Sequence, residues 1–135
     1  YYGQIVQLMD RVKFELEYLF RASPNILYKF ITTPACLVRW FCDEVDITPG
    51  GKYTFFWSGS EEVAEVLEST ADEYIRFQWE DAEDDDEYLE FRMTRSPVTG
   101  ETILLITDFS DEDEVDDQKQ LWEEQIKHLR SETGG

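Results

Sequence analysis

The sequence predicts an α+β domain in which a curved antiparallel sheet of about seven strands packs against a long C-terminal helix. Three observations predict it. Seven segments alternate between apolar and polar residues, turn residues separate the last six of them, and apolar residues recur at helical spacing near the C-terminus. The chain has 135 residues, the length of one domain, and 41% of them are hydrophobic, enough for a core.

The N-terminal third is predicted to form one strand and two short helices. Residues 12–20 alternate with period two, which is typical of a half-buried strand. Ser23 and Pro24 then provide a helix N-cap and a proline at the first helical position. Thr33 and Pro34 end that helix and begin a second, shorter one in the same way.

Six successive strands are predicted after the second helix. They cover residues around 45–47, 52–58, 61–69, 74–80, 88–95 and 101–109. Short strands joined by tight turns form a meander, and therefore pair antiparallel. The acidic segment 80–87 is predicted to be a solvated loop.

The last predicted element is a helix of about 18 residues that begins near Asp113. Its apolar face is predicted to carry Val115, Leu121, Trp122, Ile126 and Leu129, so the helix can cover the sheet. Acidic residues at its start and basic residues at its end favour the helix dipole.

Charge and composition exclude several partners. The net charge of −19 disfavours nucleic acid and anionic membranes, and no apolar run reaches the ~20 residues of a membrane span. Two cysteines without a histidine cluster predict neither a disulfide framework nor a zinc site. The calcium-loop pattern is absent too, so no metal is predicted. Reduced thiols and the lack of a signal-peptide pattern indicate a cytoplasmic location, with residues 1–11 as an N-terminal extension.

Four stretches carry a resemblance to a known family. They are Ala22-Ser23-Pro24, the segment from Thr33-Pro34 to Trp40-Phe41, the turn Pro49-Gly50-Gly51-Lys52-Tyr53, and Gln120-Leu121-Trp122 in the last helix. Their succession over residues 12–132 resembles the START-like superfamily, closest to the branch of homologues of the heat-shock chaperone ATPase activator. The resemblance implies a helix-grip fold and an apolar ligand held between the sheet and the last helix.

The concave face of such a sheet is the expected binding site. Its expected lining is Phe14, Leu37, Trp40, Tyr53, Phe55, Trp57, Phe77, Trp79, Phe91 and Trp122. The alternative is that these side chains only fill the core. Glu65 and Thr107 share strand parity with apolar neighbours and are the expected polar groups of the site, with Arg39 or Arg92 as partners for Glu65. Alternatively, Glu65 points to water.

The predicted function is a non-enzymatic module that binds a small hydrophobic molecule without a cofactor. The alternative is a co-chaperone-like adaptor that binds a protein partner through its acidic surface. A third hypothesis, an enzyme, needs a titrating group inside the cavity, because His128 is expected to be solvent-exposed and Cys36 and Cys42 to act as small hydrophobic residues. The chain is expected to be a monomer or a homodimer.

Overall fold

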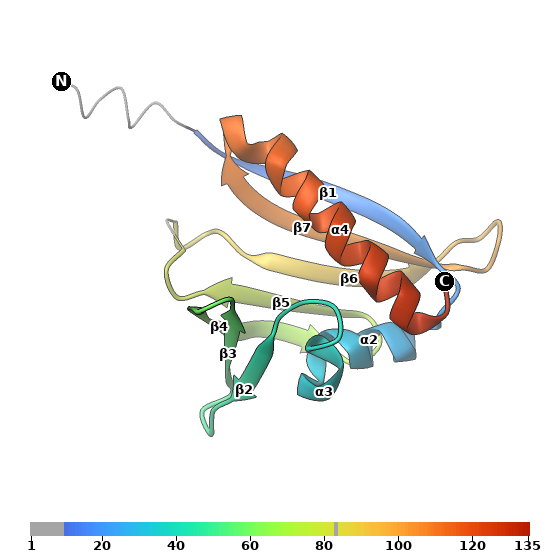
Figure 1. Cartoon of the computed structure of the whole chain (residues 1–135). Helices are drawn as coiled ribbons and strands as arrows, with labels where there is room; N and C mark the ends of the chain where they lie inside the picture. Colours follow the sequence, from blue (N-terminus) through green and yellow to red (C-terminus); the bar gives the residue numbers. More distant parts are fainter. Residues whose placement is uncertain (1–9, 83) are drawn as a thin grey trace.

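A computed structural model describes residues 10–82 and 84–135 of the chain (Figure 1). The predicted order of one strand, two short helices, six strands and one long helix is confirmed. The elements are β1 (Arg11–Phe20), α2 (Pro24–Thr32), α3 (Pro34–Leu37), β2 (Glu44–Ile47), β3 (Lys52–Trp57), β4 (Ser60–Thr70), β5 (Tyr74–Trp79), β6 (Leu89–Arg95), β7 (Thr102–Asp111), the 3₁₀ turn η1 (Glu112–Glu114) and α4 (Val115–Thr133).

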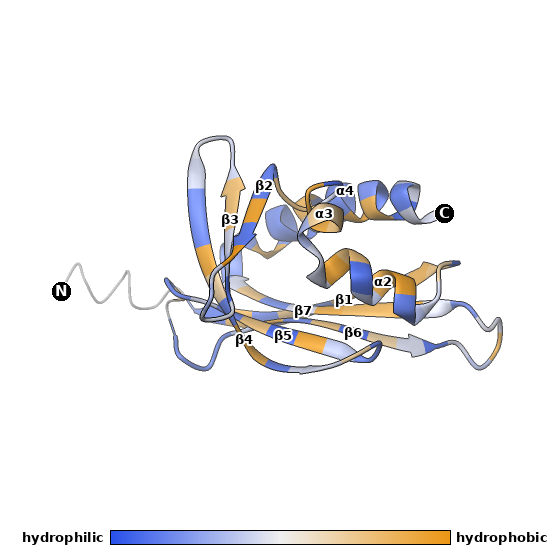
Figure 2. Ribbon diagram, turned by 90° about the horizontal axis from the view of Figure 1, so that it is seen from below, coloured by the Kyte–Doolittle hydropathy of each residue, from blue (hydrophilic) through white to orange (hydrophobic). Residues whose placement is uncertain are grey.

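Within the described residues, the seven strands form one antiparallel sheet in the order β1-β7-β6-β5-β4-β3-β2. The strands β2 to β7 form the predicted meander, and β1 pairs with β7 along its whole length, from Arg11 opposite Asp111 to Phe20 opposite Thr102. A register shift between Val66 and Glu68 places a bulge in β4, and a bulge bends and twists its strand. Figure 2 shows the result, with β2 and β3 turned up toward the side on which the helices lie.

The helices α2 and α3 begin at the predicted prolines, and α4 begins at Val115, two residues after the predicted start at Asp113. The Ser23 side chain accepts a hydrogen bond from the Ile26 amide at the start of α2, and Pro24 occupies its first turn. Pro34 likewise occupies the first turn of α3, but the Thr33 side chain makes no capping hydrogen bond. The helix α4 ends at Gly134, whose left-handed φ of 94° is the conformation that glycine adopts without strain.

The helices α2, α3 and α4 lie against one face of the sheet, which is therefore the inner face (Figure 2). Phe55 on β3, Phe77 on β5 and Phe91 on β6 are buried on it. From α4, Trp122, Ile126 and Leu129 are buried against this face, as predicted. Leu121 is the exception on the predicted apolar face of α4, because its side chain is 58% exposed.

Two strands, β4 and β7, face the opposite way from the one implied by the predicted placement of Glu65 and Thr107 in the site. On β7, Leu104 and Ile106 are fully buried and point inward, so Ile103 and Leu105 belong to the outer face. On β4, Ala64 is fully buried and points inward, so Glu65 belongs to the outer face. The alternation of side chains assigns the other residues of β7 accordingly, and those of β4 up to the bulge at Leu67.

Of the predicted N-terminal extension, residues 1–11, the structure describes residues 10 and 11. Residues 1–9 lie outside the described part of the chain, and Arg11 is already the first residue of β1. The predicted division of the chain at position 12 remains a prediction. Among the described helices, none is long and apolar enough to cross a bilayer.

Candidate functional site

The centre of the molecule is a packed aromatic core. Trp40 contacts Phe91 edge-on with ring centroids 6.2 Å apart, and Tyr53 contacts Phe77 edge-on at 5.3 Å. The indole of Trp40 donates a hydrogen bond to the Phe30 carbonyl at 2.9 Å, which fixes the ring. The cavity left in this core has a volume of about 10 Å³. Such a space holds no more than one water, so the core is closed to a ligand.

Seven of the twelve predicted site residues belong to this core and not to an open pocket. They are Phe14, Leu37, Trp40, Tyr53, Phe55, Phe77 and Phe91, and all are buried. The alternative interpretation, in which aromatic residues fill the core, therefore describes these positions.

An open cleft of about 730 Å³ lies beside the core, between the inner face of the sheet and α4. It is found at the end of the sheet where β1 begins and where β5 and β7 end. Among the described residues, α2 and α3 contribute none to its lining, whereas they contribute Ile31 and Leu37 to the closed core. The short helices thus fill one end of the space under α4 and leave the other end open. Its volume lies in the range of small-molecule sites.

Aromatic side chains form the apolar part of the cleft. Three predicted site residues, Trp57, Trp79 and Trp122, line it together with Phe41. The centroids of Trp57 and Trp79 are 6.2 Å apart, and Phe41 stacks on Trp122 at 6.1 Å. The indole of Trp57 donates to the Phe41 carbonyl at 2.6 Å. These contacts hold the rings in place before any ligand arrives.

Asp108 is the carboxylate that joins the cleft to α4. It lies on the inner face of β7, opposite Phe14 of β1. One of its oxygens accepts a hydrogen bond from the indole of Trp122 at 3.0 Å, and the other accepts one from the Phe109 amide at 2.8 Å. Burial raises the pKa of Asp108, although both hydrogen bonds act in the opposite direction.

Glu62 is a second partly buried carboxylate in the cleft. It has the inward parity of Ala64 on β4 and lies opposite Phe55 of β3. Within the part of the chain that the structure describes, it makes no hydrogen bond and no ion pair through its side chain. Burial, and then the negative charge of Asp81, raise the pKa of Glu62.

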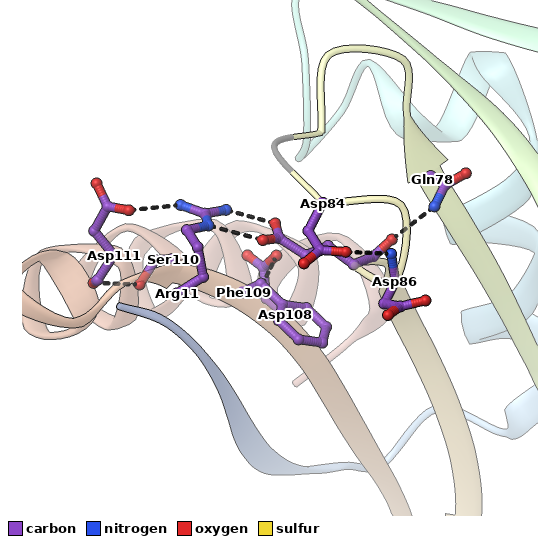
Figure 3. A network of polar contacts seen from close by, with 9 residues as sticks. Arg11, Gln78, Asp84, Asp86, Asp108, Phe109, Ser110 and Asp111 are labelled. Atoms are coloured by element: carbon purple, nitrogen blue, oxygen red, sulfur yellow. Dashed lines mark hydrogen bonds and ion pairs between the residues drawn. The ribbon is translucent and has the colours of Figure 1, made fainter. Parts of the chain in front are cut away.

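Arg11 closes one side of the cleft by binding two carboxylates (Figure 3). It donates to both oxygens of Glu87 at 2.8 and 2.6 Å and to Asp111 at 3.2 Å. The side chain of Gln78 fixes the adjoining loop by donating to the Glu87 carbonyl at 3.0 Å. The predicted loop 80–87 is present, but Glu87 is buried in this ion pair and is not solvated.

The predicted placement of Glu65 and Thr107 in the site is wrong. Glu65 is exposed on the outer face, in register with Lys52 and Gln78, as the alternative interpretation has it. Thr107 is buried but also lies on the outer face, between Glu15 and Glu90.

The predicted arginine partners bind other acids. Arg92 pairs with Glu90 at 3.1 Å and Arg39 with Glu132 at 3.6 Å. The carboxylates that the sequence interpretation missed are Glu62 and Asp108. The parity that Glu62 shares with Ala64 and Val66 was the signal that could have identified it.

The remaining reactive groups do not form a catalytic arrangement among the described residues. Cys42 is buried, and burial followed by the charge of Asp43 raises the pKa of its thiol to about 11. Cys36 does not line the cleft. His128 is exposed, as expected, and lies at the margin of the cleft.

One group of acids near the start of α4 has the spacing of metal ligands. Carboxylate oxygens of Asp111, Asp113 and Glu114 lie within 4.8 Å of one another. Asp111 is already bound by Arg11, and its hydrogen bond and charge raise the pKa of Glu114. Because exposed acids gather in this way without a metal, we assign none.

Comparisons with known proteins identify the fold. BfR322 from Bacteroides fragilis, solved by NMR, is 40% identical, and the match covers 94% of each chain with a TM-score of 0.65. The Aha1 dimer from Colwellia psychrerythraea is 16% identical over 90% of this chain and 96% of that chain, with a TM-score of 0.77. MLL2253 from Mesorhizobium loti is 18% identical over 89% of this chain and 95% of that chain, with a TM-score of 0.72. No curated protein matches the chain.

A sequence model of the START-like superfamily domain matches residues 8–135. It agrees with the observed sheet and its covering helix. The superfamily predicted from the sequence is thereby confirmed, and the Aha1 structure, from the predicted branch, shares the fold. The chain belongs to the START-like superfamily.

Proposed function

We propose that the protein is a non-enzymatic binding module that holds a small molecule with a hydrophobic body in the cleft between the sheet and α4. The observation that carries the proposal is the open volume of about 730 Å³ beside a core whose own cavity is about 10 Å³. Trp57, Trp79 and Trp122 remain binding residues in this proposal, and the seven core residues support the walls from behind.

The available side chains favour binding over catalysis. A nucleophilic cysteine needs a low pKa, whereas the pKa of Cys42 is raised to about 11. A general acid or base is usually oriented by a second side chain. Among the described residues, His128 has no such hydrogen-bonded partner. Both cysteines are free, which fits a reducing compartment, and we include a cytoplasmic location in the proposal.

A fluorescence titration with the neutral hydrophobic dye Nile red tests the location of the ligand. We compare Trp57→Phe, in the cleft, with Trp40→Phe, in the closed core. Each change removes one indole hydrogen bond to a backbone carbonyl, so the two variants are matched in that loss. Trp57→Phe should weaken dye binding about fivefold, the equivalent of roughly 1 kcal/mol of lost apolar contact.

Trp40→Phe should leave the affinity of the folded protein unchanged, with circular dichroism confirming the fold of both variants. The opposite ranking of the two variants would place the ligand in the core. The absence of dye binding and of tryptophan quenching by any neutral lipid or flavonoid would overturn the proposal.

A second candidate function is the adaptor that binds a protein partner, as a monomer or a homodimer. The observation that favours it is the excess of acids, 31 against 12 lysines and arginines. The Colwellia relative was solved as a dimer. Contacts between surface charges weaken as salt is added. A partner captured at low salt and lost at 0.5 M sodium chloride, without any effect of Trp57→Phe, would support this function instead.

A further inference from the structure

The lining of the cleft carries many more negative groups than positive ones. Among the described residues, seven carboxylates line it, with one arginine and one histidine. The arginine is Arg11, which already binds Glu87 and Asp111 (Figure 3). Among the described residues, Glu124 pairs with Lys127 at 3.3 Å and the other four carboxylates make no ion pair, so the lining keeps a net negative charge.

Two of these carboxylates lie on the inner face of the sheet next to the aromatic rings. Glu62 is on β4, across from Phe55. Asp108 is on β7 and is held by the indole of Trp122 at 3.0 Å. The donors to Asp108 are the neutral N–H groups of Trp122 and Phe109, and the charge of Arg11 acts on Asp108 without a hydrogen bond or an ion pair between them. Both negative charges are thus partly desolvated without a contacting positive charge.

Different ligand charges would affect these carboxylates in opposite ways. A neutral hydrophobic ligand would remove water from Glu62 and Asp108 without supplying a hydrogen bond or a positive charge in its place. An anionic ligand such as a fatty acid would also be repelled. A cationic group beside either carboxylate would offset its negative charge, and the half-buried indole rings of Trp57 and Trp79 would attract it as well.

We propose that the ligand of the cleft is an organic cation, an amine or quaternary ammonium group carried on an apolar body. The inference rests on the proposed binding function and specifies its ligand class. The apolar body lies along the indole rings, and the cationic group lies near Glu62 or Asp108. The pKa of each of these acids is raised by burial in the free protein, and a bound cation would lower it again.

A matched series with one alkyl chain tests the charge of the ligand. Decylamine, decanol and decanoate are titrated into the protein by calorimetry at pH 7.5 and 0.15 M sodium chloride. Decylamine should bind at least tenfold more tightly than decanol, and decanoate should bind most weakly. Decyltrimethylammonium should bind like decylamine, because it keeps the charge.

Two variants and one matched control separate the cleft from the general surface charge. Glu62→Gln and Asp108→Asn preserve shape, and the amide of the latter can still accept from Trp122. Each should weaken decylamine binding about five- to tenfold, whereas decanol should bind at least as tightly as to the wild type, because a neutral amide is easier to desolvate than a carboxylate. Glu65→Gln is the control, since Glu65 lies on the same strand as Glu62 but is exposed on the opposite face. It should change neither affinity.

The outcomes distinguish the two proposals. If decanol binds through the cleft as tightly as decylamine, the cation inference is overturned and the binding function stands. Equal weakening of decylamine by Glu65→Gln and Glu62→Gln would also overturn the inference, because surface charge would explain the binding. If no decyl compound binds but oligolysine does, both proposals fail and the adaptor function is favoured.

Discussion

Glu90 shows how the outer face of the sheet stabilises a buried charge. Its side chain is 6% exposed, and it accepts hydrogen bonds from Arg76 at 2.7 Å and from Arg92 at 3.1 Å. The two guanidinium groups in turn lie over Tyr88 and Tyr74, each 4.2 Å from the ring centroid. Burial alone would raise the pKa of Glu90, but the hydrogen bonds from Arg92 and Arg76 outweigh it and lower the pKa.

We predict that Glu90→Gln lowers the free energy of unfolding by about 1–3 kcal/mol at pH 7, because it removes the charge that both arginines bind. A lowered pKa gives stability that is present above the ordinary pKa of glutamate and is lost as the pH falls through the folded value. The difference between wild type and variant should therefore shrink from pH 7 to pH 3 in urea titrations. Glu65→Gln is the exposed control, and a difference that stays constant with pH would contradict the assignment.

The inner and outer faces of β4 and β7 are not marked by the sequence pattern, and Glu65 and Thr107 are therefore predicted on the wrong face. Residues 103–106 are apolar at every position, so neither parity of β7 is marked as the inner one. A shift of one residue exchanges the two faces of a strand, and only pairing with neighbours decides between them. On β4 the bulge leaves Leu67 unpaired and breaks the alternation there, so the apolar neighbour Leu67 is misleading about the face of Glu65.

At the scale of the element, α4 offers a direct test of how the helix is attached. Leu129 is fully buried against the sheet, whereas Leu121 on the same helix is 58% exposed at the cleft. We predict that Leu129→Ala lowers the free energy of unfolding by about 2–5 kcal/mol. The identical change at Leu121 should cost less than about 0.5 kcal/mol. Urea denaturation measures both, and equal costs would contradict the packing of α4.

Elements were predicted well because their signals are local. Ser23 and Pro24 start α2 through a cap and a fixed φ, and period-two alternation marks β1 without reference to the rest of the chain. The position of the cleft is not a local property. It depends on how far α2 and α3 reach under α4, and therefore on the packing of elements that are distant in the sequence.

At the scale of the whole molecule, the sequence predicts the sheet, the helix that covers it and the superfamily. It does not distinguish the closed core from the open cleft, so the predicted site combines residues of both. Trp40 and Trp57 are both predicted to line the site, yet one fills the closed core and the other lines the open cleft. The distinction appears only when the volume between sheet and helix is known. The aromatic residues of the chain thus both fill the closed core and line the open cleft.

The net charge of −19 also acts on the molecule as a whole. Like charges repel more strongly in the compact state than in the extended chain, so the folded form is destabilised at low ionic strength. The Debye length falls from about 30 Å at 0.01 M salt to about 8 Å at 0.15 M, which screens this repulsion.

We predict that the Tm rises between these two sodium chloride concentrations. A gain of about 1 kcal/mol would appear as roughly 3–5 °C for a domain of this size. Differential scanning calorimetry at pH 7.5 measures the change, with an equal osmolar amount of glycerol as the uncharged control. A Tm that falls with salt would show that attractive pairs such as Arg11 with Glu87 dominate over the repulsion.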